Sequence, residues 1–224
     1  MTAKKLSWVI VGLGRQAENI AKIIYASRNN RLTAVVSDNL RHASEFAKIY
    51  KVKFYSDSLP KLLLNTAQYI DAIFVASPNY QHIKQSLVGL QSKKSVLCEK
   101  PMTLSLKDGL RIKKSVKKNK IKFGVNFHLR YHPLIQEAKK IIKSGKLGKV
   151  ILIEMNWSIG NFGETKLPPL NKYSKWREDI HKSGGGAIMA RGVHLFDLLR
   201  FLTGLEIQEV MDYTDTEKKN LVDT

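Results

Sequence analysis

A glycine-rich turn between an apolar segment and an amphipathic one constrains the fold more than any other feature. In "VIVGLGRQAENIAKII" the residues from Gly12 to Ala17 read G-x-G-x-x-A. The first glycine permits a tight turn, the second lets backbone N–H groups approach a pyrophosphate, and the small third residue lets the helix pack closely on the strand. Because the turn lies in a strand–turn–helix context, it predicts a dinucleotide-binding unit whose phosphates bind at the start of the helix.

The first half of the chain alternates between apolar and helical segments. We expect strands at residues 6–12, 31–38, 52–55, 69–77, 95–98 and 121–127, with helices between them. Continuous apolar strands separated by helices are typical of a parallel sheet that is covered on both faces. Right-handed crossovers make such a sheet doubly wound. The prediction is an α/β Rossmann domain over residues 1–124.

The pattern changes after about residue 125, and a second domain of the α+β type is expected over residues 125–224. The segment 149–159 is longer than the earlier strands and alternates in places, as antiparallel strands do. A loop rich in Gly, Pro and Asn follows, then an apolar helix to about Leu202 and a strand at 206–213. The sheet of this second domain is expected to be incomplete.

Composition limits the possible partners and the compartment. Hydrophobic residues make up 43% and charged residues 25%, as in ordinary soluble proteins. No apolar run approaches the ~20 residues of a membrane helix, and the single cysteine excludes an internal disulfide, so the cytoplasm is expected. The net charge of +19 is densest at residues 107–122 and is interpreted as a solvated helix face. Without interleaved aromatics or a known motif, nucleic acid and anionic membranes are not expected partners.

An acidic residue after the second strand bears on the choice of coenzyme. Asp38 follows the glycine turn by the spacing at which a carboxylate binds the ribose hydroxyls of a dinucleotide. A carboxylate would repel a 2′-phosphate, which favours NAD over NADP. Ser37 and Arg41 leave NADP as the alternative. Asp38 is also placed where it would cap the next helix, which is compatible with coenzyme binding.

Polar residues follow the fourth and fifth strands, where an open parallel sheet binds its ligands. The fourth strand ends in "ASPNYQH" and the fifth in "VLCEKP". Glu99 is expected to hydrogen-bond the nicotinamide end of the coenzyme or to hold the neighbouring lysine. Lys100 is expected to bind or protonate a substrate oxygen. The alternative for this pair is a surface salt bridge.

These stretches, with "FHLRYHP", "SGKLGKV" and "KWREDIHKSGGGAIMARGVHLFDLLRFLTG", resemble the Gfo/Idh/MocA family of NAD(P)-dependent oxidoreductases. The resemblance runs in order from residue 6 to about residue 211. It implies a Rossmann domain followed by a domain with a large, open, mostly antiparallel sheet that often forms subunit contacts, hence a homo-oligomer if that sheet is complete. It also implies hydride transfer between the nicotinamide and a hydroxyl-bearing carbon of a sugar, inositol or related compound. Lys100 takes the place of the lysine in the family's EKP motif.

The resemblance also points to a histidine on the helix after three glycines. His194 would exchange a proton with the substrate alcohol in the cleft between the domains. A histidine on an apolar helix is otherwise often a satisfied core residue. Many members of the family have Asp four residues before this histidine, where this chain has Ala190. Asp197, one turn further along, is interpreted as structural.

Other polar residues complete the predicted site. Trp176 and Arg177 would line a sugar pocket, with surface packing as the alternative, and Arg130 would contact coenzyme or substrate or brace the domain junction. No metal site is expected, because Pro133 interrupts the spacing of His128 and His132. The catalytic residues are then Lys100 and His194. The expected coenzyme-binding residues are Gly12, Leu13, Gly14, Arg15, Gln16, Ser37, Asp38, Ser77, Pro78, Asn79, Glu99, Lys100 and Arg130.

The sequence therefore predicts an oxidoreductase that acts with NAD, or NADP, on a small sugar or polyol. Members of the family usually extend well beyond this length. The alternative is accordingly a truncated, catalytically inactive dinucleotide-binding protein or partner module.

Overall fold

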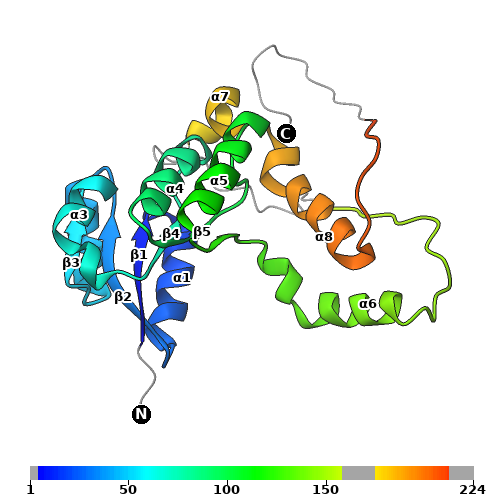
Figure 1. The fold of residues 1–224 in the computed structure, drawn as a ribbon, viewed down its shortest axis with the longest axis horizontal. Helices are drawn as coiled ribbons and strands as arrows, with labels where there is room; N and C mark the ends of the chain where they lie inside the picture. The colour runs from blue at the N-terminus through cyan, green and yellow to red at the C-terminus, as the bar shows by residue number, and fades with distance from the viewer. Residues whose placement is uncertain (1–4, 158–174, 212–224) are drawn as a thin grey trace, which may run out of the picture. The chain divides into compact units, whose positions relative to one another are not determined.

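The computed structural model describes residues 5–157 and 175–211 of the chain. The chain forms two compact units, Met1–Asn126 and Phe127–Thr224 (Figure 1). Within the described ranges, every helix is too short or too polar to cross a membrane.

The first unit is built on one parallel sheet. Its strands lie in the order β3-β2-β1-β4-β5-β6, and every neighbouring pair is parallel. This is the order of a doubly wound dinucleotide-binding fold, in which the chain reverses direction across the sheet between β1 and β4. The strand bounds are β1 (Leu6–Val11), β2 (Asn30–Val36), β3 (Phe54–Ser56), β4 (Ala72–Val75), β5 (Ser95–Cys98) and β6 (Phe123–Val125).

Helices connect these strands, and several start at recognisable caps. Asn39 caps α2 by accepting from the backbone N–H of His42, and Ser105 caps α5 by accepting from Asp108. The helices α4 and α5 lie side by side (Figure 1). The bounds are α1 (Arg15–Ala26), α2 (Leu40–Ile49), α3 (Leu59–Thr66), α4 (His82–Gln91) and α5 (Leu106–Asn119), with 3-10 turns at Ala67–Tyr69 and Asn79–Gln81.

The central strands β1, β2 and β4 bury residues on both of their faces. Successive side chains of a strand point to opposite faces, so Val9 and Val11 enter one apolar cluster while Ile10, between them, enters another. The first cluster includes residues of α3 and α5, and the second includes residues of α1 and α2. Helices therefore cover both faces of the sheet, which is why its strands are continuously apolar.

The second unit is mainly helical over its described residues. Its helices are α6 (Pro133–Lys143), α7 (Ile180–Ser183) and α8 (Val193–Thr203), and a π-helical turn at Ile188–Gly192 leads into α8. The helices α6 and α8 pack against each other. Short 3-10 turns lie at His128–Tyr131 and Lys175–Glu178.

The strands expected in the second unit are not formed in its described part. Residues 149–157 and 204–211 have no regular secondary structure, and Ile151 and Leu152 are 90% and 80% exposed. A strand needs a hydrogen-bonded neighbour, which an alternating sequence does not supply by itself. The rest of the two expected strands, and the loop expected at residues 160–173, lie outside the described residues. The fourth strand is also shorter than expected: β4 spans Ala72–Val75, and Tyr69 belongs to a 3-10 turn at Ala67–Tyr69.

Candidate functional site at the carboxyl edge of the parallel sheet

The turn after β1 depends on two glycines for different reasons. Gly12 has a φ of +84°, and a Cβ atom there would lie 2.5 Å from the Cα of Ser77. Gly12 therefore permits close packing of the first turn on the chain after β4. A Cβ atom on Gly14, by contrast, would meet no heavy atom within 4 Å. The space in front of Gly14 is open.

The start of α1 fits the pyrophosphate of a dinucleotide. Gly14 is its N-cap and supplies no side-chain hydrogen bond to the N–H groups of the first turn. These N–H groups carry the positive end of the helix dipole and bind anions readily. Arg15 and Gln16 are exposed there, while Leu13 and Ala17 are buried beneath them. The predicted phosphate-binding residues thus offer backbone N–H donors at a solvent-accessible helix start, which packs on the protein core through Leu13 and Ala17.

Two predicted residues follow β2. Asp38 is exposed, and Ser37 is buried at 7% exposure. The hydroxyl of Ser37 lies 3.5 Å from the Asp38 carboxylate and 3.3 Å from the backbone N–H of Asn39, which donates to it. Asn39, rather than Asp38, caps the next helix. The capping role considered for Asp38 is therefore wrong, and its exposed carboxylate is in a position to accept from ribose hydroxyls.

The chain after β4 is held by side chains of α4. The Ser77 hydroxyl donates to Oε1 of Gln85 over 2.5 Å, and Ser77 itself is buried. Pro78 and Asn79, which follow, are half-buried. Asn79 begins the 3-10 turn that leads into α4.

Glu99 and Lys100 lie just past the end of β5. Glu99 is buried at 6% exposure, and its Oε1 accepts from Nδ2 of Asn126 over 2.6 Å. Its Oε2 lies 3.3 Å from the backbone nitrogen of Lys100, which donates to it. The side chain of Lys100 is half-buried. The Glu99 carboxylate thus connects the backbone of Lys100 to Asn126, just past β6. Its function toward the coenzyme or toward the lysine side chain stays a prediction.

Parallel pairing brings these segments to one edge of the sheet. β1 pairs with β4 up to Val11 and Val75, and β4 pairs with β5 up to Val75 and Cys98. The turn at Gly12, the chain from Ser77 and the Glu99–Lys100 segment therefore all emerge at the carboxyl ends of neighbouring strands. Open α/β sheets bind ligands at this edge, next to the point where the strand order reverses.

His194 is buried in the second unit, at 4% exposure, near the start of α8. Three aromatic rings surround it. The ring of Trp157 is stacked with its centroid 5.8 Å away, and the rings of Phe127 and His128 meet it edge-on at 6.0 and 5.3 Å. The preceding π-helical turn is a feature that often occurs at functional sites. Asp197 and Leu198, one turn further along α8, are buried as well.

Arg130 forms a bidentate ion pair with Asp197 within the second unit. Its Nε donates to Oδ2 of Asp197 over 2.8 Å, and its Nη2 donates to Oδ1. The pKa of Arg130 is raised above its ordinary value, chiefly by this hydrogen bond. Arg130 also lies over the rings of Phe127 and Phe201. The ion pair agrees with the structural interpretation of Asp197.

Trp176 and Arg177 contact each other, with the guanidinium 4.5 Å from the centre of the indole. A stacked cation occupies one face of the Trp176 ring, the kind of face that a sugar would use. This arrangement resembles the surface packing that was the alternative for the two residues. Their function in a sugar pocket stays a prediction.

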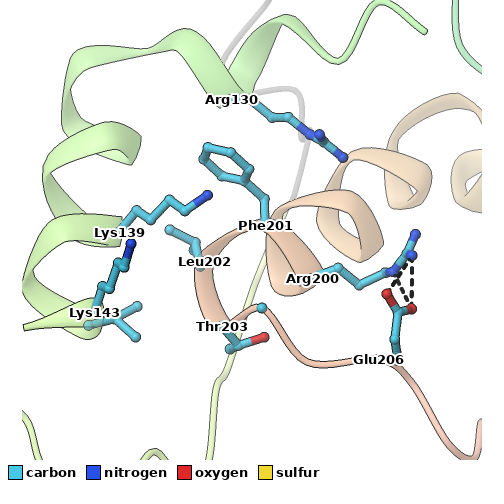
Figure 2. Close-up of a pocket in the computed structure, with 10 residues that line it drawn as sticks. Arg130, Lys139, Lys143, Arg200, Phe201, Leu202, Thr203 and Glu206 are labelled. Carbon is cyan, nitrogen blue, oxygen red and sulfur yellow. Dashed lines mark hydrogen bonds and ion pairs between the residues drawn. The ribbon is translucent and has the colours of Figure 1, made fainter. Parts of the chain in front are cut away.

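The second unit also has a shallow pocket of about 540 Å³ between α6 and α8 (Figure 2). Cations line it, but two of them are engaged: Arg200 donates to both carboxylate oxygens of Glu206 at 2.8 Å, and Arg130 binds Asp197. Nζ of Lys139 lies 3.5 Å from the centre of the Phe201 ring. Arg130 is the one predicted site residue in its lining, so the predicted chemistry lies elsewhere.

Several residues next to the predicted ones were not found from the sequence. One of them is Asn126, which donates to Glu99; others are Phe127 and Trp157, whose rings surround His194. No sequence motif indicates these contacts, because the spacing of residues along the chain does not show which ones the fold brings together. His82 stands in the quoted stretch "ASPNYQH". Its position at the start of a helix after a strand end was a signal that could have been followed.

Comparison with known proteins identifies the family. A family model described as "Oxidoreductase family, NAD-binding Rossmann fold" matches residues 6–127, and one described as "GFO/IDH/MocA C-terminal domain" matches residues 135–224. The chain therefore belongs to the Gfo/Idh/MocA oxidoreductases, and its first unit is the NAD-binding Rossmann domain of that family.

Named relatives in this family include enzymes of sugar and inositol metabolism. The chain is 28% identical over 197 residues to glucose-6-phosphate 3-dehydrogenase of Bacillus subtilis, covering 86% of this chain and 52% of that protein. It is 28% identical over 205 residues to myo-inositol 2-dehydrogenase of Thermotoga maritima, covering 90% and 56%. The chain thus spans a little over half the length of these curated relatives.

A solved structure supports the same fold. The WlbA dehydrogenase from Chromobacterium violaceum, solved in complex with NADH and UDP-GlcNAcA, matches with a TM-score of 0.85 and 25% sequence identity. The match covers 100% of this chain and 62% of that one.

Proposed function

We propose that this chain acts as an NAD(P)-dependent oxidoreductase on a hydroxyl-bearing carbon of a sugar, an inositol or a related polyol. One observation carries the proposal: the open helix start at Gly14 and the Glu99–Lys100 segment emerge at the same edge of one parallel sheet. Names of relatives supply the substrate class, since they include dehydrogenases of a sugar phosphate and of inositol. In this proposal residues 1–124 bind the dinucleotide and residues 125–224 bind the substrate.

The coenzyme would be held by the residues at that edge. The N–H groups from Gly14 to Gln16 would bind the pyrophosphate, and Asp38 would accept from the adenosine ribose, which makes NAD the preferred form. Ser77, Pro78 and Asn79 would line the groove toward the nicotinamide. When bound, NAD(P) supplies the group that exchanges a hydride with the substrate carbon.

Lys100 would carry the proton chemistry of the substrate oxygen. Its ammonium is an N–H donor on a flexible stem, and its backbone is fixed by the carboxylate of the buried Glu99. Fixing the backbone limits the positions that the ammonium samples, which lowers the entropic cost of orienting it. His194 would assist in proton transfer, and the surrounding rings of Phe127, His128 and Trp157 restrict the orientation of its imidazole.

The second unit would carry a mostly antiparallel sheet. The exposure of Ile151 and Leu152 supports this proposal, because large apolar side chains are normally covered by a packed layer. With that sheet complete, subunit contacts between copies of the chain would follow.

The proposal is tested by coenzyme reduction and by one substitution with a matched control. Formation of NADH or NADPH is followed by absorbance across polyols, sugars, sugar phosphates and nucleotide sugars. Lys100→Met should lower kcat by about a hundredfold or more, as expected for loss of an acid–base group, while the Kd of NADH stays within about threefold of the wild-type value. Lys122 lies at the amino end of β6, away from the carboxyl ends of the strands. Lys122→Met should therefore change neither kcat nor the Kd of NADH.

The outcomes separate the alternatives. Near-normal turnover of Lys100→Met would remove this residue from the mechanism. Binding of NADH with no turnover across the whole panel would favour a dinucleotide-binding protein without catalysis. Absence of coenzyme binding at millimolar concentration would contradict the proposed function altogether.

A further inference from the structure

A buried histidine connects two of the segments that emerge at the carboxyl edge of the sheet. His82 is the first residue of α4 and is 1% exposed. Its Nδ1 lies 2.7 Å from the carbonyl oxygen of Pro101, and its Nε2 lies 2.8 Å from the carbonyl oxygen of Ser77. One ring thus contacts the chain after β4 and the chain after β5.

The two carbonyls lie where the sheet no longer holds the backbone. Pairing of β4 with β5 ends at Val75 and Cys98, so Ser77 and Pro101 both follow the last paired residues. A buried carbonyl without a donor is costly, and a neutral imidazole supplies a donor to one of these two carbonyls. A neutral ring donates through one nitrogen and a protonated ring through both. The ring therefore continues the connection between the two chains beyond the end of the ladder.

The charged groups around the ring are those of the predicted site. Glu99 and Lys100 act electrostatically on His82, with opposite signs. Burial lowers the pKa of His82, and it outweighs the two carbonyls and Glu99, which raise it. Cys98, the last residue of β5, and Ser86 of α4 are fully buried. His82 can affect the position of Lys100 through the backbone alone. Its ring contacts the carbonyl oxygen of Pro101, and Pro101 directly follows Lys100.

We propose that His82 is a positioning residue, which fixes the segment carrying Glu99 and Lys100 relative to the chain at Ser77–Asn79. The inference rests on the proposed function for its catalytic consequence. Its structural part concerns this chain alone and is independent of any coenzyme. On this view Glu99 fixes the Lys100 backbone from the side of β6, through Asn126, and His82 fixes the same segment from the side of α4.

The test uses three variants of the same helix. His82→Leu removes both contacts with a side chain of comparable size. His82→Gln retains an amide nitrogen that carries two hydrogens for carbonyl acceptors. Ser86→Ala is the matched control, because Ser86 is buried on α4, one turn further along, and its removal leaves the carbonyls of Ser77 and Pro101 untouched.

Hydrogen exchange is measured first on the coenzyme-free protein. In His82→Leu, peptides covering residues 99–104 should exchange about tenfold faster or more, as expected for loss of a buried hydrogen bond, while peptides from β2 keep the wild-type rate. The segment should return most of the way to the wild-type rate in His82→Gln. Ser86→Ala should exchange as the wild type does over residues 99–104.

Kinetics then test the catalytic consequence. The expected result for His82→Leu is a fall in kcat of about tenfold or more with a substrate KM within about threefold of wild type, because the lysine would be misplaced without loss of the substrate pocket. His82→Gln should recover most of the loss. Equal exchange over residues 99–104 and equal kcat in His82→Leu and Ser86→Ala would overturn the inference. If the wild type itself turns nothing over, the proposed function fails, and hydrogen exchange alone decides the inference.

Discussion

A Cβ atom on Gly12 would lie 2.5 Å from the Cα of Ser77, so the first turn of the sheet packs directly on the chain after β4. Gly14, two residues later, has open space around the same position. The two glycines of one motif thus serve different purposes, the first structural and the second available for a ligand. This difference gives a pair of substitutions with opposite expected effects.

Gly12→Ala should lower the free energy of unfolding by about 2 kcal/mol or more, because alanine meets backbone atoms and is strained at a φ of +84°. Gly14→Ala should change the same quantity by no more than about 1 kcal/mol, the range of an N-cap substitution. The second variant should instead weaken NADH binding about tenfold or more. Urea unfolding and fluorescence titration measure the two effects. Wild-type NADH affinity in Gly14→Ala would show that the pyrophosphate does not approach this residue.

Coenzyme preference should depend on Asp38. In Asp38→Ser the ratio of NADPH to NADH affinity should rise by about tenfold or more, because a carboxylate that repels the 2′-phosphate and accepts from ribose hydroxyls is removed. Asp57→Ser is a suitable control, since Asp57 follows the neighbouring strand β3 and pairs with Lys61 at 3.3 Å. Equal preference in the wild type and in Asp38→Ser would mean that another residue discriminates.

The ion pair between Arg130 and Asp197 should contribute to the stability of the second unit. Asp197 has a side-chain exposure of 5%, so Arg130→Met would leave a buried carboxylate without its bidentate partner. We expect the free energy of unfolding to fall by about 1–3 kcal/mol. Arg200→Met, at an exposed pair with Glu206, should have a much smaller effect. A change in the Kd of NADH in Arg130→Met would additionally support the predicted contact of Arg130 with the coenzyme.

His82 should make stability depend on pH. Its folded-state pKa is lowered by burial, so at acid pH the unfolded chain takes up a proton that the folded chain excludes. The contribution of neutral His82 to the free energy of unfolding is fully present above the pKa of the unfolded state, about 6.5. It is lost as the pH falls toward the lower pKa of the folded state. The contribution of this one group is at most about 1.4 kcal/mol per pH unit. Chemical unfolding of the wild type and of His82→Gln between neutral pH and mild acid measures it, and identical slopes for the two proteins would contradict the assignment.

The sequence was most informative about the first unit, for physical reasons. Strands that are buried on both faces must be continuously apolar, and the helices between them must be amphipathic, so six strands and their order along the chain were predictable. Strand ends were less so. Tyr69 was expected to begin the fourth strand, but Tyr69 ends a 3-10 turn and the strand begins at Ala72.

The second unit shows the limit of such patterns. Alternation at residues 149–159 identifies a segment that is able to form a strand, yet within the described part of the chain residues 149–157 are not paired in a sheet. The contacts of the candidate site could not be predicted from the sequence either. Nothing near Glu99 in the sequence indicates Asn126, and nothing near His194 indicates Trp157, because both neighbours are brought in by the fold.

Cys98 ends β5 with its side chain fully buried, and burial raises the pKa of its thiol to about 12. It is also the single cysteine of the sequence. Maleimide reagents react with accessible thiolates, so the native chain should stay unlabelled while folded. One cysteine introduced at an exposed position would then carry a fluorophore or spin label at a known place, without prior removal of the natural one.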